Sequence, residues 1–322
     1  MKGSVAAAVV SAYLALNTGP ASAYTALFAF GDSLSDAGNA YIASGHSTPV
    51  FPYVGGHFSN GPTWVEDLSQ ELGLGTLEPS LGGGTDFAVG GATTADLGLE
   101  VDEFEAYAAL EKLTPATLNG ALFTLDIGAD DILGVLGESQ TAAMNAITAA
   151  ANNAAAEVET LHTDGARSLL YYEVPQLGLT PEVEALGTGA ETLADSLAQL
   201  FNSTLLSDLA PFETGDDPLK VFTLDTYDLL GDVVNDPQRY GFTNVTEPCI
   251  DSSACLSGSP SFQDTYLFFD GLHPTEGGHL LAADLAYALV APEPSTWAMM
   301  LIGFAGFGFA GWRARRRTAA SA

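Results

Sequence analysis

Short apolar runs alternate along this chain with longer segments of helical periodicity, and no other feature of the sequence constrains the fold as strongly. The runs are rich in aromatic and β-branched residues, as strands are. They lie at residues 27–30, 122–127, 168–174 and 221–224. Strands separated by helices form βαβ units, in which the strands are parallel and helices cover both faces of the sheet. The alternation therefore predicts an α/β protein with a parallel sheet.

Three of the intervening segments have the pattern of helices. In 191–209, leucines and one phenylalanine recur at a period of about 3.6 residues and form one apolar stripe. Segment 141–162 is rich in alanine, and the Asp-Gly pair at 164–165 is a typical helix stop. A last helix is expected at 275–290. Ligands of such sheets bind beyond the carboxyl ends of the strands, so functional residues are expected just after each strand.

The protein is strongly acidic, with 9 Lys and Arg residues against 40 Asp and Glu and a net charge of −31. Within 24–291 the cations are Lys112, Arg167, Lys220 and Arg239. Such a surface repels polyanions, which excludes nucleic acid as a partner and argues against docking on anionic lipid. Salt tolerance, divalent cation binding and a soluble surface without any partner are all compatible with it. The sequence contains no EF-hand spacing and no Asp-rich repeat, so no metal site is predicted.

The first 23 residues have the pattern of a secretory signal peptide. A single early cation, Lys2, is followed by an apolar run and by Ala-Ser-Ala at 21–23, small residues that typically precede a cleavage site. We expect cleavage before Tyr24, export of the chain, and one folded domain over 24–291. The alternative is an uncleaved membrane anchor.

The other end, 292–322, combines Pro-Glu-Pro at 292–294, an apolar stretch over 297–312 and a cluster of arginines. This order of parts resembles the PEP-CTERM sorting signal. The resemblance implies that an exosortase recognises and cuts the tail, in a Gram-negative bacterium that makes exopolysaccharide. The protein would then pass through the inner membrane to the cell surface or matrix, where exopolysaccharide is a candidate partner. A plain C-terminal anchor is the alternative.

The cysteines of the chain are Cys249 and Cys255, in a polar segment over 241–263. In an exported protein such a close pair is expected to form a disulfide, since no histidine or further cysteine lies near enough to complete a metal site. We expect 241–263 to be a long irregular loop that this bond holds in place. The sequence contains no haem, zinc or iron–sulfur motif, and no cofactor is predicted.

A candidate nucleophile, Ser33, follows the first predicted strand in the sequence Gly31-Asp32-Ser33. A serine between a strand end and a helix start exposes its side chain at the edge of the sheet, and the N–H groups there point toward incoming negative charge. The same residues also suit an ordinary helix N-cap, which is the alternative interpretation.

A candidate general base, His273, lies near the other end of the domain, three residues after Asp270. The carboxylate can orient one ring nitrogen, which leaves the other nitrogen free to accept a proton from a serine. Histidine is the side chain whose ordinary pKa suits this task near neutral pH. An isolated Asp-x-x-His is weak evidence, but together with Gly-Asp-Ser it indicates a serine hydrolase.

Four blocks in order resemble the SGNH, or GDSL, hydrolase family. They are GDSLSDAGN at 31–39, DFAVGGA at 86–92, GADD at 128–131 and DGLHP at 270–274. The resemblance implies a three-layer α/β/α sandwich with a flavodoxin-like parallel sheet.

The resemblance also assigns roles to individual residues. It makes Ser33 the nucleophile, His273 its base and Asp270 the group that orients the imidazole. The backbone N–H groups of Ser33 and Gly91 would form the oxyanion hole, together with the side chain at position 130.

Position 130 departs from the family pattern, which has asparagine where this chain has Asp130. A carboxylate donates no hydrogen bond, whereas a protonated carboxyl group does. Three outcomes stay open: a protonated Asp130 that still donates, a side chain that turns away and leaves a slower enzyme, or a protein without catalysis.

The function expected from these residues is hydrolysis of carboxylic esters by a secreted serine esterase or lipase, through an acyl-enzyme on Ser33. One alternative is a weak or inactive protein of the same fold that binds exopolysaccharide in the matrix. Another is a polysaccharide deacetylase or acyltransferase that uses the same serine. The substrate is an ester of a small molecule, a lipid or an acylated sugar, and the sequence does not choose among them.

Overall fold

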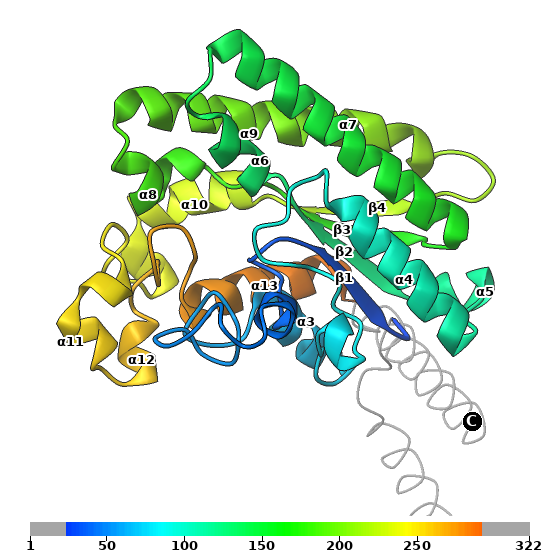
Figure 1. Cartoon of the computed structure of the whole chain (residues 1–322), viewed down its shortest axis with the longest axis horizontal. Coiled ribbons are helices and arrows are strands. Elements are labelled where there is room, and N and C mark those ends of the chain that lie inside the picture. Colours follow the sequence, from blue (N-terminus) through cyan, green and yellow to red (C-terminus); the bar gives the residue numbers. More distant parts are fainter. Residues whose placement is uncertain (1–23, 292–322) are drawn as a thin grey trace, which may run out of the picture. The chain divides into compact units, whose positions relative to one another are not determined.

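The computed structural model describes residues 24–291 (Figure 1). The predicted signal peptide and the predicted sorting tail lie outside the described residues. Among the helices of 24–291, none is both long enough and apolar enough to cross a membrane.

The sheet consists of four parallel strands, as predicted, and they are hydrogen-bonded in the order in which they occur in the chain. The strands are β1 (Leu27–Gly31), β2 (Leu122–Asp126), β3 (Ser168–Tyr172) and β4 (Lys220–Leu224). Residues of β1 and β2 are buried throughout, which explains why these runs are continuously apolar rather than alternating.

A further extended segment, 85–89, lies along the free edge of β1 and was not predicted as a strand. The Phe87 N–H donates to the Ala29 carbonyl over 2.8 Å, and the Val89 N–H donates to the Gly31 carbonyl over 2.9 Å. This pairing places the sequence block at 86–92 beside the end of β1, where Ser33 follows.

One face of the sheet is covered by α4 (Leu97–Glu111), α6 (Ala129–Val135), α7 (Gln140–Asp164) and α9 (Thr188–Leu209), which lie together in Figure 1. Helices α7 and α9 are the two predicted at 141–162 and 191–209. Helix α7 stops at Gly165, whose φ of 127° favours glycine. Phe28 and Phe30 of β1 pack on this side with Phe104 of α4.

The other face is covered by α3 (Trp64–Glu71) and α13 (Glu276–Val290), the last predicted helix. Leu27 and Ala29, which alternate with the phenylalanines of β1, pack here with Trp64 and Ala283. The period of two residues along a strand sends neighbouring side chains to opposite faces. The three-layer α/β/α sandwich is therefore confirmed.

The remaining elements are short and connect these layers. They are α2 (Asn39–Ala43), η1 (Ser80–Gly82), α5 (Pro115–Leu118), η2 (Leu177–Leu179), α8 (Pro181–Glu184), η3 (Ala210–Glu213), α10 (Thr226–Asn235), η4 (Pro237–Tyr240), η5 (Cys249–Asp251), α11 (Ser253–Leu256) and α12 (Pro260–Gln263).

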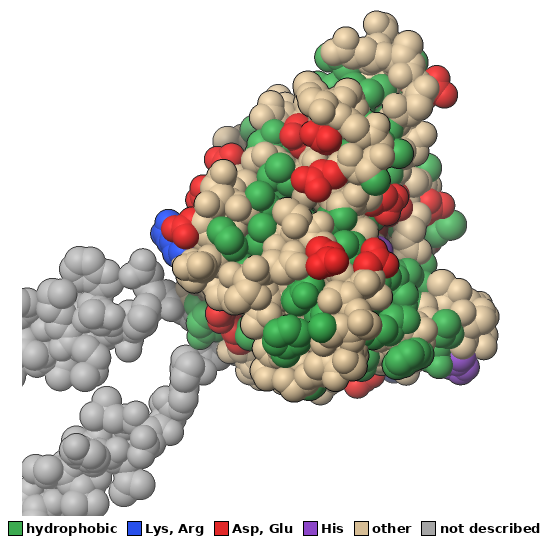
Figure 2. Space-filling view, turned by 90° about the vertical axis from the view of Figure 1, so that its left-hand side faces the viewer, with side chains coloured by type: hydrophobic (Ala, Val, Ile, Leu, Met, Phe, Trp, Pro, Cys, Tyr) green, Lys and Arg blue, Asp and Glu red, His purple; other side chains and the backbone are tan. Residues whose placement is uncertain are grey.

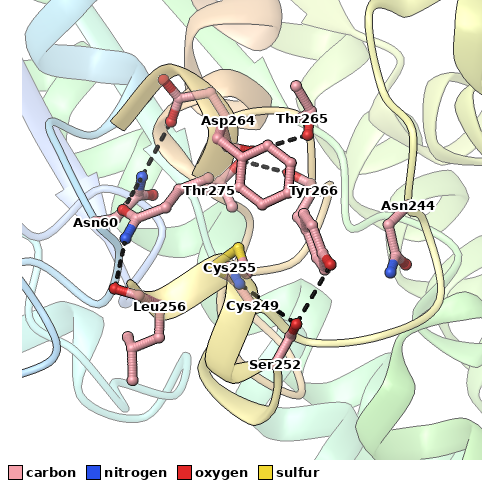
Figure 3. The surroundings of a disulfide bond; sticks show 12 residues. Asn60, Asn244, Cys249, Ser252, Cys255, Leu256, Asp264, Thr265, Tyr266 and Thr275 are labelled. Carbon is pink, nitrogen blue, oxygen red and sulfur yellow. Dashed lines mark hydrogen bonds between the residues drawn. A yellow bond between two sulfur atoms is a disulfide. The ribbon is translucent and has the colours of Figure 1, made fainter. Parts of the chain in front are cut away.

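The predicted disulfide joins Cys249 and Cys255 (Figure 3). The segment around it was expected to be irregular throughout, but it contains the single-turn helices α11 and α12. The Cys249 N–H donates to the Phe268 carbonyl and the Ile250 N–H to the Phe269 carbonyl, each over 2.9 Å. The disulfide loop is thereby attached to the residues that lead directly to Asp270.

Acidic side chains are spread among hydrophobic ones over the face drawn in Figure 2. Arg167 and Asp217 form an ion pair, and Lys220 lies over the ring of Phe222. Because the domain has so few cations, such contacts neutralise little of its acidic charge.

Candidate active site

The predicted site residues meet at the carboxyl edge of the sheet. Ser33 follows β1, and Asp130 lies in the first turn of α6, which follows β2. His273 comes from the loop before α13. Because the strands are parallel, the segments that leave their carboxyl ends converge on the same edge.

Ser33, His273 and Asp270 form one chain of hydrogen bonds. His273 Nε2 lies 2.7 Å from Ser33 Oγ, and His273 Nδ1 lies 2.7 Å from Asp270 Oδ2. A carboxylate can only accept, so the proton of a neutral imidazole lies on Nδ1 and Nε2 is free to accept from the serine. Two side chains that are 240 positions apart in the sequence are thus in direct contact.

The turn that carries His273 is built by Asp270 itself. Asp270 Oδ1 accepts the backbone N–H groups of Leu272, over 2.8 Å, and of His273, over 2.7 Å. The Phe269 N–H donates to the His273 carbonyl over 2.8 Å and closes the turn. The spacing of three residues between Asp270 and His273 therefore allows one carboxylate to bind both the ring and the backbone of the histidine.

Tyr53 also belongs to this site, although no local pattern around it indicated a functional role. Its hydroxyl donates to Asp270 Oδ2 over 2.8 Å, so this oxygen accepts from both Tyr53 and His273. Burial by itself raises the pKa of Asp270, but the hydrogen bonds and the charge of His273 outweigh burial and the pKa lies below its usual value. Asp270 is therefore held as a carboxylate.

Both backbone donors that are predicted for the oxyanion hole lack an acceptor among the residues that the structure describes. They are the N–H groups of Ser33 and Gly91. The neighbouring Gly90 N–H is already occupied, since it donates to Asp36 Oδ2 over 2.8 Å. Gly91 has a φ of 84°, which a residue with a side chain rarely adopts. The choice of Gly91 over Gly90 as the free donor thus has a structural reason.

Side chains of the block 31–39 shape the loop that carries this glycine. Asn39 Nδ2 donates to the carbonyls of Asp86 and Ala88 over 2.8 and 2.9 Å. Asp86 in turn accepts the Ala37 N–H over 2.6 Å. The two sequence blocks occur together because each is folded against the other.

Asp130 lines the same cavity as Ser33 and His273, so its position is not remote from the site. Burial raises its pKa, the nearby His273 opposes the rise, and repulsion from Asp131 adds to it. The carboxylate of Asp131 accepts the N–H and the hydroxyl of Thr94, each over 2.9 Å. Asp131 therefore ties the segment after Gly91 to α6.

Further carboxyl groups are buried beneath the nucleophile. Asp32 Oδ1 accepts the Leu34 N–H over 3.1 Å, whereas Asp32 Oδ2 has no partner among the described residues. Asp126 accepts from the Ser35 hydroxyl over 3.1 Å. Burial raises the pKa of Asp126 to about 7, and burial together with repulsion from Asp126 raises the pKa of Asp32.

A family model described as GDSL-like lipase/acylhydrolase matches residues 27–286, most of the chain. The chain belongs to this family. A second model, the PEP-CTERM protein-sorting motif, matches residues 290–317 and so confirms the resemblance of the tail.

Similar proteins are found in bacteria and plants. An uncharacterized protein of Pseudomonas putida is 30% identical over 87% of this chain, which spans only 50% of that protein's length. A GDSL esterase/lipase of Arabidopsis thaliana is 27% identical, with 83% of this chain and 87% of the plant protein covered. Among solved structures, an acetylxylan esterase from Geobacillus stearothermophilus has a TM-score of 0.46 and 14% identity, with 84% of this chain and 95% of that chain covered.

Proposed function

We propose that this protein is a secreted serine esterase that hydrolyses carboxylic esters through an acyl-enzyme on Ser33. The observation that carries the proposal is the hydrogen-bonded chain from Ser33 Oγ through His273 to Asp270. In a chain of the GDSL family this arrangement fits acyl transfer, because it supplies a nucleophile, a base and a carboxylate that orients the base.

In the first half of the reaction, Ser33 Oγ attacks the carbonyl carbon of the ester while His273 Nε2 takes the hydroxyl proton. The carbonyl oxygen becomes an oxyanion, to which the N–H groups of Ser33 and Gly91 donate. Asp270 stabilises the imidazolium through Nδ1–H. When the tetrahedral intermediate collapses, His273 gives its proton to the departing alkoxide and the alcohol leaves.

In the second half, water attacks the carbonyl carbon of the acyl-enzyme and gives its proton to His273 Nε2. Collapse of the second intermediate breaks the bond to Ser33 Oγ, which recovers the proton from His273. The carboxylic acid is released, and the enzyme returns to its starting state.

Hydrolysis of 4-nitrophenyl esters by the wild type and by Ser33→Ala tests the proposal. We expect the variant to lose on the order of 10⁶-fold in kcat, as removal of a nucleophile does in serine hydrolases. A fluorophosphonate probe should label the wild type and not the variant. Equal rates in the two proteins would eliminate the esterase and favour the matrix-binding alternative.

We also propose that the chain is exported and that an exosortase cuts the tail. The match to the PEP-CTERM motif and the signal-peptide pattern of the first 23 residues support this. The mass of the protein recovered from the cell surface tests it, because both ends should be missing.

A further inference from the structure

A cavity lies beside the candidate catalytic residues. The space between its lining side chains, with the open solvent at its mouth included, is about 770 Å³. Ser33, Asp130 and His273 lie on its lining, and the opposite walls come from α10 and α13. The cavity therefore adjoins the place where the ester carbonyl must lie.

Its walls are almost entirely hydrocarbon. Leu229, Leu230 and Val233 of α10 face it, as do Leu281 and Ala282 of α13. Further apolar lining comes from the neighbouring core and includes Leu34, Ala129, Leu177, Leu267 and Phe268. These side chains belong to three separate hydrophobic clusters of the core, so the cavity lies where the three meet.

We propose that this cavity binds the acyl part of the substrate and selects aliphatic chains of medium length over acetyl. The inference rests on the proposed esterase function, because the acyl carbon must be bonded to Ser33 Oγ. Hydrocarbon walls gain free energy from each methylene that leaves water. An acetyl group leaves most of the cavity unfilled and gains little from it.

Two other occupants fit the cavity less well. A sugar would bring hydroxyl groups against leucine and valine side chains that offer them no hydrogen-bond partner. A free fatty acid would bring a carboxylate to a lining whose described residues include no lysine or arginine to pair with it. The neutral ester is therefore the species that the cavity accepts best.

The experiment is a series of 4-nitrophenyl esters from acetate to decanoate with the wild-type enzyme. We expect kcat/KM to rise by about fourfold for each methylene that the cavity buries, which is on the order of 10³-fold from acetate to octanoate if all of the added methylenes are buried. A rate that is highest for acetate and falls with chain length would overturn the inference. If Ser33→Ala abolishes that acetate activity, the esterase proposal survives this result.

A substitution at Ala282 tests directly whether the cavity causes the preference for longer acyl chains. It is buried on α13 and lines the cavity, so Ala282→Leu fills part of the space. We expect the ratio of kcat/KM for octanoate to that for acetate to fall by about tenfold. Ala288→Leu makes the same change on the exposed side of the same helix and should leave the ratio unchanged. An unchanged ratio in Ala282→Leu would overturn the inference.

If the wild type hydrolyses none of the esters, ligand binding can still test the cavity independently of catalysis. Ser33→Ala with methyl octanoate is then the probe, and thermal unfolding is the measurement. A rise in Tm that Ala282→Leu removes and Ala288→Leu keeps would support an acyl-binding cavity in a protein without esterase activity. The absence of any rise would overturn the inference about the cavity as well.

Discussion

Asp270 and Asp32 are both buried in the candidate active site, where they are 7% and 1% exposed. They differ in the hydrogen-bond donors that surround their carboxyl groups. Asp270 accepts hydrogen bonds from the Tyr53 hydroxyl, the His273 ring and two backbone N–H groups. Asp32 accepts the Leu34 N–H on one oxygen, and its other oxygen has no donor among the described residues.

The directions of the two pKa shifts depend on the number of hydrogen-bond donors, because both carboxyl groups are buried. Hydrogen bonds and the charge of His273 lower the pKa of Asp270 in spite of its burial. Burial and the neighbouring carboxylates raise the pKa of Asp32. On the side of the base, the protein thus holds a charge that stabilises an imidazolium. On the side of the nucleophile, it favours neutral carboxyl groups, which do not repel a developing oxyanion.

Replacing Asp130 by asparagine is the change with the largest expected effect on this comparison. A charged Asp130 cannot donate to the oxyanion, so Asp130→Asn should raise kcat by about 10²-fold at alkaline pH. Because the pKa of Asp130 is raised, the carboxyl group gains its own donor as the pH falls, and the advantage of asparagine should shrink. The pH profiles of kcat for the two proteins measure this.

The double variant Ser33→Ala/Asp130→Asn is the control, since any gain must depend on the serine. If kcat of Asp130→Asn does not exceed that of the wild type at any pH, residue 130 does not contribute a donor to the oxyanion hole.

Tyr53→Phe tests the part of the comparison that concerns Asp270. It removes one of the four donors to Asp270, so the pKa of Asp270 should rise and kcat should fall by about tenfold, with little change in KM. The acid limb of the pH profile should move to higher pH, which a purely structural role of Tyr53 would not produce. Tyr266→Phe is the matched control, because Tyr266 packs in the same aromatic cluster but its hydroxyl contacts Ser252. An unmoved acid limb in Tyr53→Phe would contradict the prediction.

The smallest expected effect is on stability. The folded protein raises the pKa of Asp126 to about 7, whereas an unfolded carboxyl group titrates near 4. Stability from this group is therefore complete below about pH 4 and is lost as the pH rises toward about 7. Raised values of about 7 at Glu71 and Glu173 act in the same direction. We expect Tm to be several degrees lower at about pH 8 than at about pH 5.

Asp126→Asn should flatten this dependence, because an amide cannot ionise. The exposed Asp251→Asn should leave it unchanged. A Tm that rises from acid to neutral pH in the wild type would contradict raised pKa values of the buried carboxyl groups.

Much of the fold could be read from the sequence because its periodicities are local. The runs at 27–30 and 122–127 became strands since both of their faces are buried, which demands continuous apolar residues. The segment 85–89 was missed because hydrogen bonds to β1, rather than its own pattern, make it extended. The helical turns at 253–263 were missed because single-turn helices carry no stripe that a periodicity search detects.

The sequence by itself determined the chemistry of the candidate site. Gly-Asp-Ser after a strand and Asp-x-x-His before a helix are local patterns, whose turns are formed by hydrogen bonds within a few residues. Only the tertiary structure decided which groups join them. Tyr53 reaches Asp270 across 217 positions, and the cavity beyond Ser33 exists where α10 and α13 approach each other. Contacts of this kind depend on the path of the whole chain, which no local spacing of residues encodes.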